Sequence, residues 1–227
     1  RSPMFYPTPA VGNATRVHRM LEIDPATNAT KMFVYLNDGV IGASGSNQLR
    51  TQDWKIGDMA AINDSTFLII EAALRGTSDK KNIYLINING ATNVTSALYG
   101  GKTLEALIDS AGMASVSVKP VRKRLFLDLL ANGWDATLDK AEGLAIINDS
   151  TIAVGNDNDF GQTCPLANGL PIATTVTSHV VTYGLKGSNK IPNLKTFVPL
   201  ISQGFTGPSS TRSSASICWR RDRTIHC

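Results

Sequence analysis

The sequence predicts an all-β fold, and three observations indicate it. Thr, Asn, Ser, Val and Ile are plentiful while long helical patterns are scarce, and β-branched residues favour strands. Short apolar runs are bounded by Asn, Asp, Gly and Pro, as strands joined by tight turns are. One hairpin pattern also occurs twice, because Asn-Asp-Ser-Thr stands at 63–66 and again 85 residues later at 148–151. Together these features predict short antiparallel strands.

A second repeated pattern alternates with the first. Residues 23–30 read IDPATNAT and residues 88–95 read INGATNVT, so the units start near 23, 57, 88 and 142. Each pair of hairpins would make one four-stranded sheet, which cannot bury both faces alone. Radial stacking of such sheets, at roughly 40 to 50 residues each, gives a β-propeller. We therefore expect a partial β-propeller of four-stranded antiparallel blades, and the alternative is chance similarity between two turn-rich hairpins.

The elements follow in chain order. Prolines at positions 3, 7 and 9 predict an irregular loop over residues 1–13. Apolar runs predict strands at 16–23, 31–36, 82–88, 125–129 and 197–201, a first copy of the repeated hairpin at 57–71, a second copy whose strands are 145–147 and 151–154, and a strand pair within 172–185.

Residues 97–120 are extra length between the matched units and should form an insertion. Thr103 is a candidate cap for one short helix that runs through Ser110, and Gly112 would end it. The predicted fold class is thus all-β with one short helix in an insertion.

One domain is expected over residues 1–206, followed by a Ser- and Arg-rich tail over 207–227. The formal charge of the chain is +4, and four arginines against one aspartate in the tail account for most of it. The rest of the chain is close to neutral, so nucleic-acid binding is not predicted. No apolar run approaches the length of a membrane span. The chain begins at Arg1, and we expect a fragment or processed chain that lacks the front blades.

Cysteines and glycosylation motifs bear on the compartment. The three cysteines leave two alternatives open, a bridge from Cys164 to Cys218 or Cys227 and a free thiol, and no spacing suggests zinc. Five Asn-X-Ser/Thr motifs fall in predicted turns, where a glycan could be accommodated. A secreted glycoprotein is therefore expected rather than an intracellular protein. The motifs start at Asn13, Asn28, Asn63, Asn93 and Asn148.

The second copy of the hairpin ends in a cluster of acid and amide side chains. Glu142 precedes its first apolar run, and Asn-Asp-Asn-Asp at 156–159 follows its second. In an extended chain, Asp157 and Asp159 would point to one face and the two asparagines to the other. Oxygen donors of this kind suit Ca²⁺ or Mg²⁺ rather than zinc or copper.

A linear calcium loop starting at Asp157 does not fit, because Asn168 would stand at its twelfth position, where an acid is needed. Any metal site must therefore combine residues from different blades, with Asp58, Glu71 and Glu142 as further contributors. The alternative is that these acids and amides only cap turns and satisfy backbone groups.

A basic run and three histidines are further candidate functional residues. The basic run Arg122-Lys123-Arg124 is either a solvated strand end or a patch that faces phosphate. His18, His179 and His226 give no catalytic pattern, since the sequence has no Gly-X-Ser-X-Gly elbow to partner them.

These motifs resemble those of a known family. Glu142-Gly143-Leu144-Ala145 and the run 156–161 are similar to segments of the phytase-like family described as "esterase-like activity of phytase", whose members are mostly secreted and propeller-like. The resemblance extends over about residues 2–161. It also rests on Ser2-Pro3-Met4, on Ile23-Asp24-Pro25, on Gly57-Asp58 followed by Leu68–Glu71, and on 83–95. The sequence departs from the pattern in reaching a basic residue after Glu71 only at Arg75, and in showing no match beyond Gly161.

The resemblance implies a secreted hydrolase that acts on a small phosphoester. Glu142, Asp157 and Asp159 would act in acid–base roles at the channel mouth or bind a divalent cation, Ca²⁺ or Mg²⁺. Such an ion would hold phosphate oxygens and stabilise developing charge. Because one fold hosts enzymes and passive binders alike, a non-catalytic extracellular binding or scaffold propeller is the alternative. The further metal ligands expected are Asp58, Glu71, Asn156 and Asn158.

Overall fold

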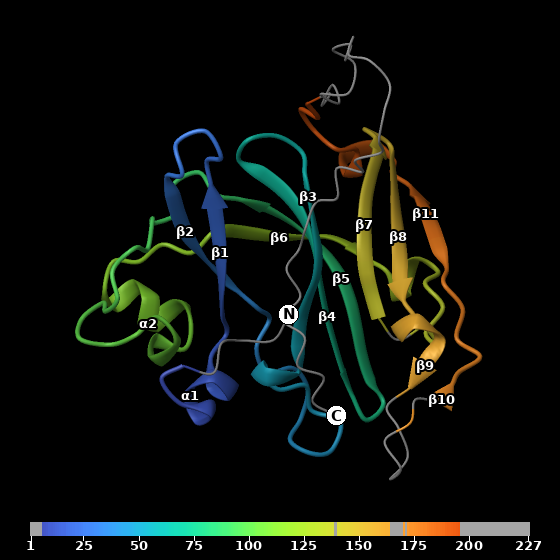
Figure 1. The fold of residues 1–227 in the computed structure, drawn as a ribbon, viewed down its shortest axis with the longest axis horizontal. Helices are drawn as coiled ribbons and strands as arrows, with labels where there is room; N and C mark the ends of the chain where they lie inside the picture. Colours follow the sequence, from blue (N-terminus) through green and yellow to red (C-terminus); the bar gives the residue numbers. More distant parts are fainter. Residues whose placement is uncertain (1–5, 139, 164–169, 171, 196–227) are drawn as a thin grey trace, which may run out of the picture.

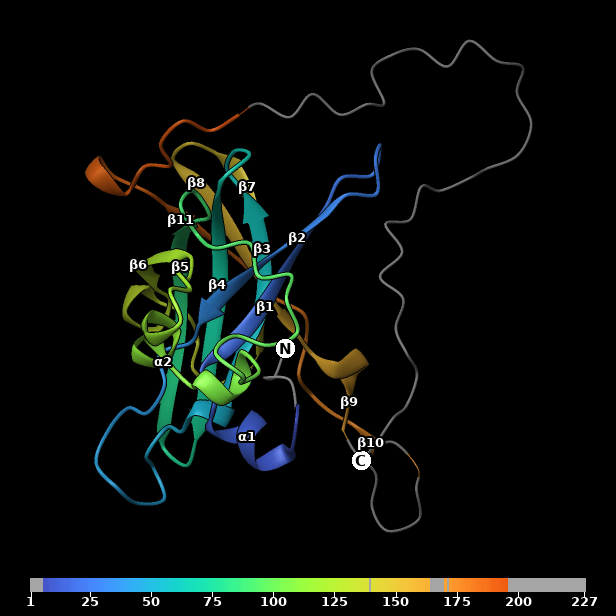
Figure 2. The ribbon, with the colours of Figure 1, turned by 90° about the vertical axis from the view of Figure 1, so that its left-hand side faces the viewer.

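The computed structural model describes residues 6–138, 140–163, 170 and 172–195. Within this part of the chain, antiparallel sheets of two to four strands make up most of the fold (Figures 1 and 2). These sheets do not close into a ring here. The all-β, antiparallel class is therefore confirmed, and the propeller stays a prediction. The strand expected at 197–201, the tail at 207–227 and the three cysteines lie outside the described residues.

The central sheet has four strands in the order β3-β4-β5-β6. They are β3 (Trp54–Ala61), β4 (Thr66–Arg75), β5 (Ser78–Asn87) and β6 (Arg122–Asp128). The first Asn-Asp-Ser-Thr turn joins β3 to β4, and its Asn63 side chain accepts a hydrogen bond from the Ser65 N–H. The turn prediction is thus confirmed at this hairpin.

The next sheet has the order β11-β8-β7 and lies to the right of the central sheet in Figure 1. Its strands are β7 (Lys140–Asn148), β8 (Thr151–Asp157) and β11 (Val180–Gly184). The second Asn-Asp-Ser-Thr turn joins β7 to β8, and Asn148 again accepts from the N–H two residues on. The repeated unit is therefore a three-stranded antiparallel sheet, in which β7, β8 and β11 take the places of β3, β4 and β5 although β9 and β10 lie between β8 and β11 in the chain.

Two smaller sheets complete the described strands. β1 (Val17–Ile23) pairs with β2 (Thr30–Leu36), and β9 (Gln162–Thr163) pairs with β10 (Ile172–Ala173). The expected grouping of β1–β2 with β3–β4 into one sheet is wrong, because β3 and β4 continue into β5 and β6 instead. The IDPATNAT and INGATNVT segments follow β1 and β5, so β1–β2 corresponds to β5–β6.

The helices differ from the expectation in number and place. α1 (Pro9–Ala14) begins where an irregular loop was expected, because Thr8 caps it and Pro9 suits a first helical position. In the insertion, α2 (Ser110–Ser115) begins near the residue where a helix was expected to end, since the Asp109 carboxylate accepts from the N–H groups of Ala111 and Gly112. The described part of the chain also has five short 3₁₀ turns, at Thr51–Asp53, Glu105–Leu107, Leu130–Asn132, Asp159–Gly161 and Gly187–Asn189.

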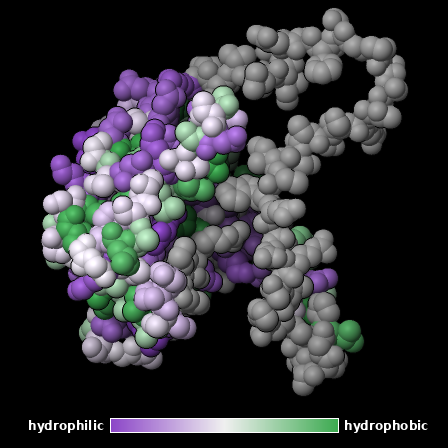
Figure 3. All heavy atoms as spheres, turned by 60° about the vertical axis from the view of Figure 1, so that its left-hand side comes forward, coloured by the Kyte–Doolittle hydropathy of each residue, from purple (hydrophilic) through white to green (hydrophobic). Residues whose placement is uncertain are grey.

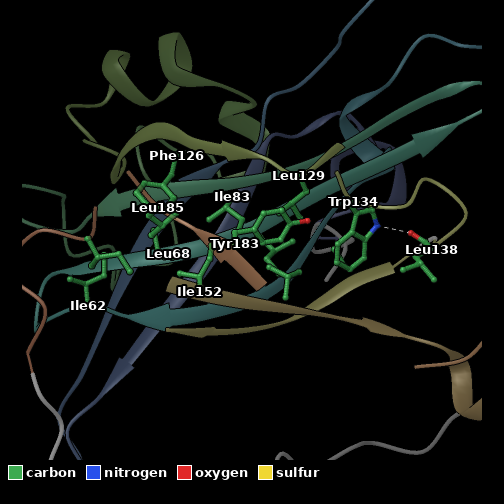
Figure 4. Close-up of a cluster of buried hydrophobic side chains, with 14 residues drawn as sticks. Ile62, Leu68, Ile83, Phe126, Leu129, Trp134, Leu138, Ile152, Tyr183 and Leu185 are labelled. Atoms are coloured by element: carbon green, nitrogen blue, oxygen red, sulfur yellow. Dashed lines mark hydrogen bonds between the residues drawn. The ribbon is translucent and has the colours of Figure 1, made fainter. Parts of the chain in front are cut away.

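The main core fills the space between the central sheet and the β7-β8-β11 sheet (Figure 4). Alternate residues of β4 and β5, including Leu68 and Ile83, face Ile152 of β8 and are fully buried. Trp134 closes one end, and its indole N–H donates to the Leu138 carbonyl. On the face shown in Figure 3, small groups of hydrophobic side chains lie among hydrophilic ones.

β3 and β7 approach each other closely at Gly57. A Cβ atom at this position would lie 2.4 Å from the Ala141 carbonyl oxygen, closer than atoms can pack. One residue further on, the Asp58 carboxylate accepts hydrogen bonds of 2.8 Å from the N–H groups of Met59 and Leu144. Gly57 and Asp58 thus fix the position of β7 against the central sheet.

The opposite face of the central sheet is joined to β2 by a buried polar cluster. Glu71 of β4 is fully buried and accepts from the Tyr35 hydroxyl, from Lys123 at 2.6 Å and from the Asp38 N–H at 2.8 Å. Lys123 also donates to Asp38 at 2.7 Å and lies 3.9 Å from the centre of the Tyr84 ring. Burial raises the pKa of Glu71, and the neighbouring Lys123 opposes this rise. Neither interpretation of the basic run fits Lys123, which points inward.

We predict that Gly57→Ala destabilises the fold. The added methyl group overlaps the Ala141 carbonyl and must displace β7, and overpacking of this kind costs about 1–3 kcal/mol. Urea unfolding measures the free energy of unfolding. The matched control is Gly184→Ala on β11, where a Cβ would meet no atom within 4 Å. Equal stability of the two variants would contradict the close approach of β3 and β7.

We also predict that Glu71→Gln lowers the free energy of unfolding by about 2 kcal/mol or more. The change leaves Lys123 with one carboxylate and turns an amide N–H₂ toward buried donors. Glu22→Gln is the control, because its ion pair with Lys31 is exposed and such pairs contribute about 1 kcal/mol or less. Denaturant unfolding at neutral pH compares them, and a Glu71 variant as stable as wild type would remove the structural role of this cluster.

Candidate active site

A cleft of about 160 Å³ lies between the central sheet and β7. Its lining carries both signs of charge and four small residues, and most of it comes from β3, β4, β5 and β7. The lining residues are Asp53, Lys55, Gly57, Ala72, Ala73, Leu74, Asp79, Lys81, Lys140, Ala141 and Glu142.

Two lysines stand on either side of a small residue. Lys55 of β3 pairs with Ala72 of β4, and Ala72 pairs with Lys81 of β5. Residues paired across a sheet share a face, and the outer two strands of such a row lie roughly 10 Å apart. Because Ala72 has only a methyl group, the space between the lysines stays open toward β7.

Lys81 is a buried cation at the wall of this cleft. Its side chain is 1% exposed, and its ammonium forms an ion pair with Asp79. An ammonium carries three N–H donors, so one carboxylate does not exhaust its capacity. The second oxygen of Asp79 is buried and makes no hydrogen bond to any other described residue. Such a pair holds unused hydrogen-bonding groups beside the cleft.

Glu142 reaches the cleft from β7 because the strand is bulged there. Ala141 pairs with Asn156 and Gly143 with Gly155, which leaves Glu142 without an opposite residue. Bulges redirect side chains in this way. The Glu142 side chain is half-buried, and within the described ranges it accepts no hydrogen bond.

The other two predicted catalytic acids gather around Lys140 at the end of the same hairpin. Asp157 stands opposite Lys140 in the strand register, and Lys140 forms an ion pair with Asp159. The Asp157 carboxylate accepts from the Asp159 N–H at 2.9 Å. The sequence predicted that strand alternation would point Asp157 and Asp159 to one face. Asp159 instead lies in a 3₁₀ turn and not on the strand, so strand alternation does not place it. The lining of the cleft includes Glu142 and neither aspartate.

The predicted metal ligands do not come together. Asp58 bonds across to β7, while Glu71 lies in the cluster on the opposite face of the central sheet. Asn156 donates to the Thr177 carbonyl and accepts from the His179 N–H, and Asn158 donates to the Val176 carbonyl. Among the residues that the structure describes, no three His, Cys, Asp or Glu side chains are grouped as a metal would require. The described donors, as they are placed, therefore do not fit a shared metal ion.

Lys55, Asp79 and Lys81 line the cleft but were not predicted from the sequence. The signal for the last two was their spacing of two residues at the start of a strand, which places opposite charges on one face. Nothing in the sequence shows that Ala72 separates the two lysines, because this depends on the register of β3, β4 and β5.

The five glycosylation motifs all lie in the described part of the chain. Asn28, Asn93 and Asn148 are exposed, and Asn13 and Asn63 are half-buried. Among the described helices, none has the length and apolar character that crossing a membrane requires.

Comparison with known proteins gives one finding. The family model described as "Phytase-like: Esterase-like activity of phytase" matches residues 4–160, which includes β1 to β8 and the cleft. Comparison with the curated proteins and with the solved structures returned no match. The family match spans well over half of the chain, and the chain therefore belongs to the phytase-like family.

Proposed function

We propose that this domain hydrolyses phosphoesters in the cleft between the central sheet and β7. The observation that carries the proposal is the pairing of Glu142, a half-buried carboxylate that accepts no hydrogen bond from another described residue, with lysines across the same cleft. The phytase-like family description supports an esterase-type activity.

In the proposed chemistry the lysines bind the phosphate group and Glu142 transfers the proton. Lys55 and Lys81 attract the phosphate group and stabilise the charge that develops on its oxygens. Glu142 acts as general acid–base: it takes the proton of the attacking water as the new phosphorus–oxygen bond forms, and it returns that proton to the leaving oxygen as the phosphorus–oxygen bond to the alcohol breaks. Asp157 and Asp159 are engaged at the hairpin end, so their proposed part is to hold Lys140.

The volume of the cleft limits what enters it. Pockets for drug-sized ligands enclose about 300–1,000 Å³, whereas this cleft holds about 160 Å³. We infer that one phosphate group and its nearest atoms enter while the rest of the substrate stays outside. The proposed setting is extracellular, which the three exposed glycosylation motifs support.

A non-catalytic binding or scaffold module is the second candidate function. It is favoured by the hydrogen bonds of Asp58, Asp157 and Asn156, which satisfy backbone N–H groups as structural side chains do. In this function the domain binds a phosphorylated ligand, or none, without turnover.

We predict that Glu142→Gln lowers kcat/KM for p-nitrophenyl phosphate about 10²- to 10⁴-fold, the usual contribution of a general acid–base, while the melting temperature stays unchanged. The assay is repeated with bis(p-nitrophenyl) phosphate and inositol hexakisphosphate, each with EDTA and with added calcium or magnesium. Glu22→Gln is the control, because Glu22 is an exposed acid on β1.

Full turnover in the Glu142 variant would remove the assigned role. No turnover of any substrate by the wild-type protein under all of these conditions would instead favour the binding module. In that case, a rise in melting temperature with inorganic phosphate that Lys55→Met abolishes would keep the cleft as a binding site.

A further inference from the structure

The end of the β7–β8 hairpin holds a built-in positive charge. Lys140 is the first residue of β7 and pairs in register with Asp157, the last residue of β8. Its side chain is 28% exposed, and its ammonium contacts the carboxylate of Asp159. Glu142 follows two residues later on the same strand. The ammonium therefore contacts one carboxylate directly, and Asp157 on the paired strand and Glu142 on its own strand are neighbouring acids.

The backbone after β8 brings Asp159 back to this lysine. Asp159, Phe160 and Gly161 have φ angles of 51°, 61° and 68°, so three successive residues are left-handed. Two of them are not glycine, and non-glycine residues in this region cost free energy that the surroundings must offset. The hydrogen bond from the Asp159 N–H to Asp157 and the ion pair of Asp159 with Lys140 are among the contacts that hold this turn.

The electrostatics agree with this geometry. Partial burial lowers the pKa of Lys140, but the bond to Asp159 and the charges of Asp159, Asp157 and Glu142 outweigh burial and raise it above its ordinary value. The ammonium is thus held in its charged form by the three acids that the sequence suggested as ligands or partners of a divalent cation.

We propose that Lys140 takes the place of a metal ion at this hairpin: its ammonium neutralises the acid set of Glu142, Asp157 and Asp159, and the wild-type hairpin needs no bound cation. Removal of the ammonium would leave the Asp159 carboxylate without its ion pair, with Asp157 and Glu142 as neighbouring negative charges. Carboxylates in this number suit calcium, which accepts flexible oxygen coordination. The substitution Lys140→Met should therefore create the cation dependence that the wild-type protein lacks.

The test measures melting temperature and not activity, so it is independent of the proposed hydrolysis. Wild type and Lys140→Met are melted in EDTA and in millimolar calcium chloride. Wild type should melt at the same temperature in both. The variant should melt at least about 2–4 °C lower in EDTA, the shift expected from a small loss of stability in a chain of this size, and calcium should restore most of that loss.

Lys195→Met is the matched control. Lys195 also forms an ion pair, with the single exposed carboxylate of Asp64, so its removal should create no response to calcium. The proposal is overturned if calcium raises the melting temperature of wild type or of this control by as much as it raises that of Lys140→Met. It is also overturned if calcium does not raise the melting temperature of Lys140→Met.

If Lys140→Met fails to fold, isothermal titration of wild type with calcium decides the question. Absence of binding heat supports the proposal, and so does a heat that Asp159→Asn leaves unchanged, since that cation binds elsewhere. A heat of binding that disappears in Asp159→Asn overturns it, because the acid set would then hold a metal beside Lys140.

Discussion

The close approach of β3 and β7 at Gly57 is the constraint on which the candidate site depends. No side chain fits between Gly57 and the Ala141 carbonyl, and Asp58 bonds across the same junction. The junction holds Glu142, on the β7 side, against the cleft whose other wall carries Lys55 and Lys81.

Strand alternation explains why acids of one type have such different surroundings. Glu71 and Ala72 are neighbours on β4, yet Glu71 faces β2 and Ala72 faces the cleft. On its own face Glu71 meets Tyr35 and Lys123, which satisfy it fully. Glu142 lies at a bulge in β7 and meets no donor among the described residues. A buried, fully bonded acid holds the fold together, whereas Glu142, half-buried and without a described donor, is left to line the cleft.

Much of the strand pattern could be predicted because it depends on local chemistry. The two Asn-Asp-Ser-Thr turns close hairpins through their own side chains, so their outcome needed no distant contact. The grouping of hairpins into sheets could not be predicted, since it depends on whether β4 pairs onward with β5. The site was predicted in part for the same reason: Glu142 followed from a motif, whereas the row of Lys55, Ala72 and Lys81 exists only through strand register.

Lys140 connects the ion pair at the hairpin end with the cleft, because acids on both sides can bind its ammonium. Lys140 lies at the boundary, because it lines the cleft and also pairs with Asp159. With Asp157 and Asp159 beside it, the ammonium is shared among acids that do not line the cleft. Glu142 therefore does not need to serve as its main partner, and its carboxylate can face the lysines of the central sheet. A direct ion pair between Lys140 and Glu142 would neutralise the acid to which the proposed hydrolysis assigns the proton transfer, so the contact with Asp159 leaves that carboxylate to the cleft and also holds the turn.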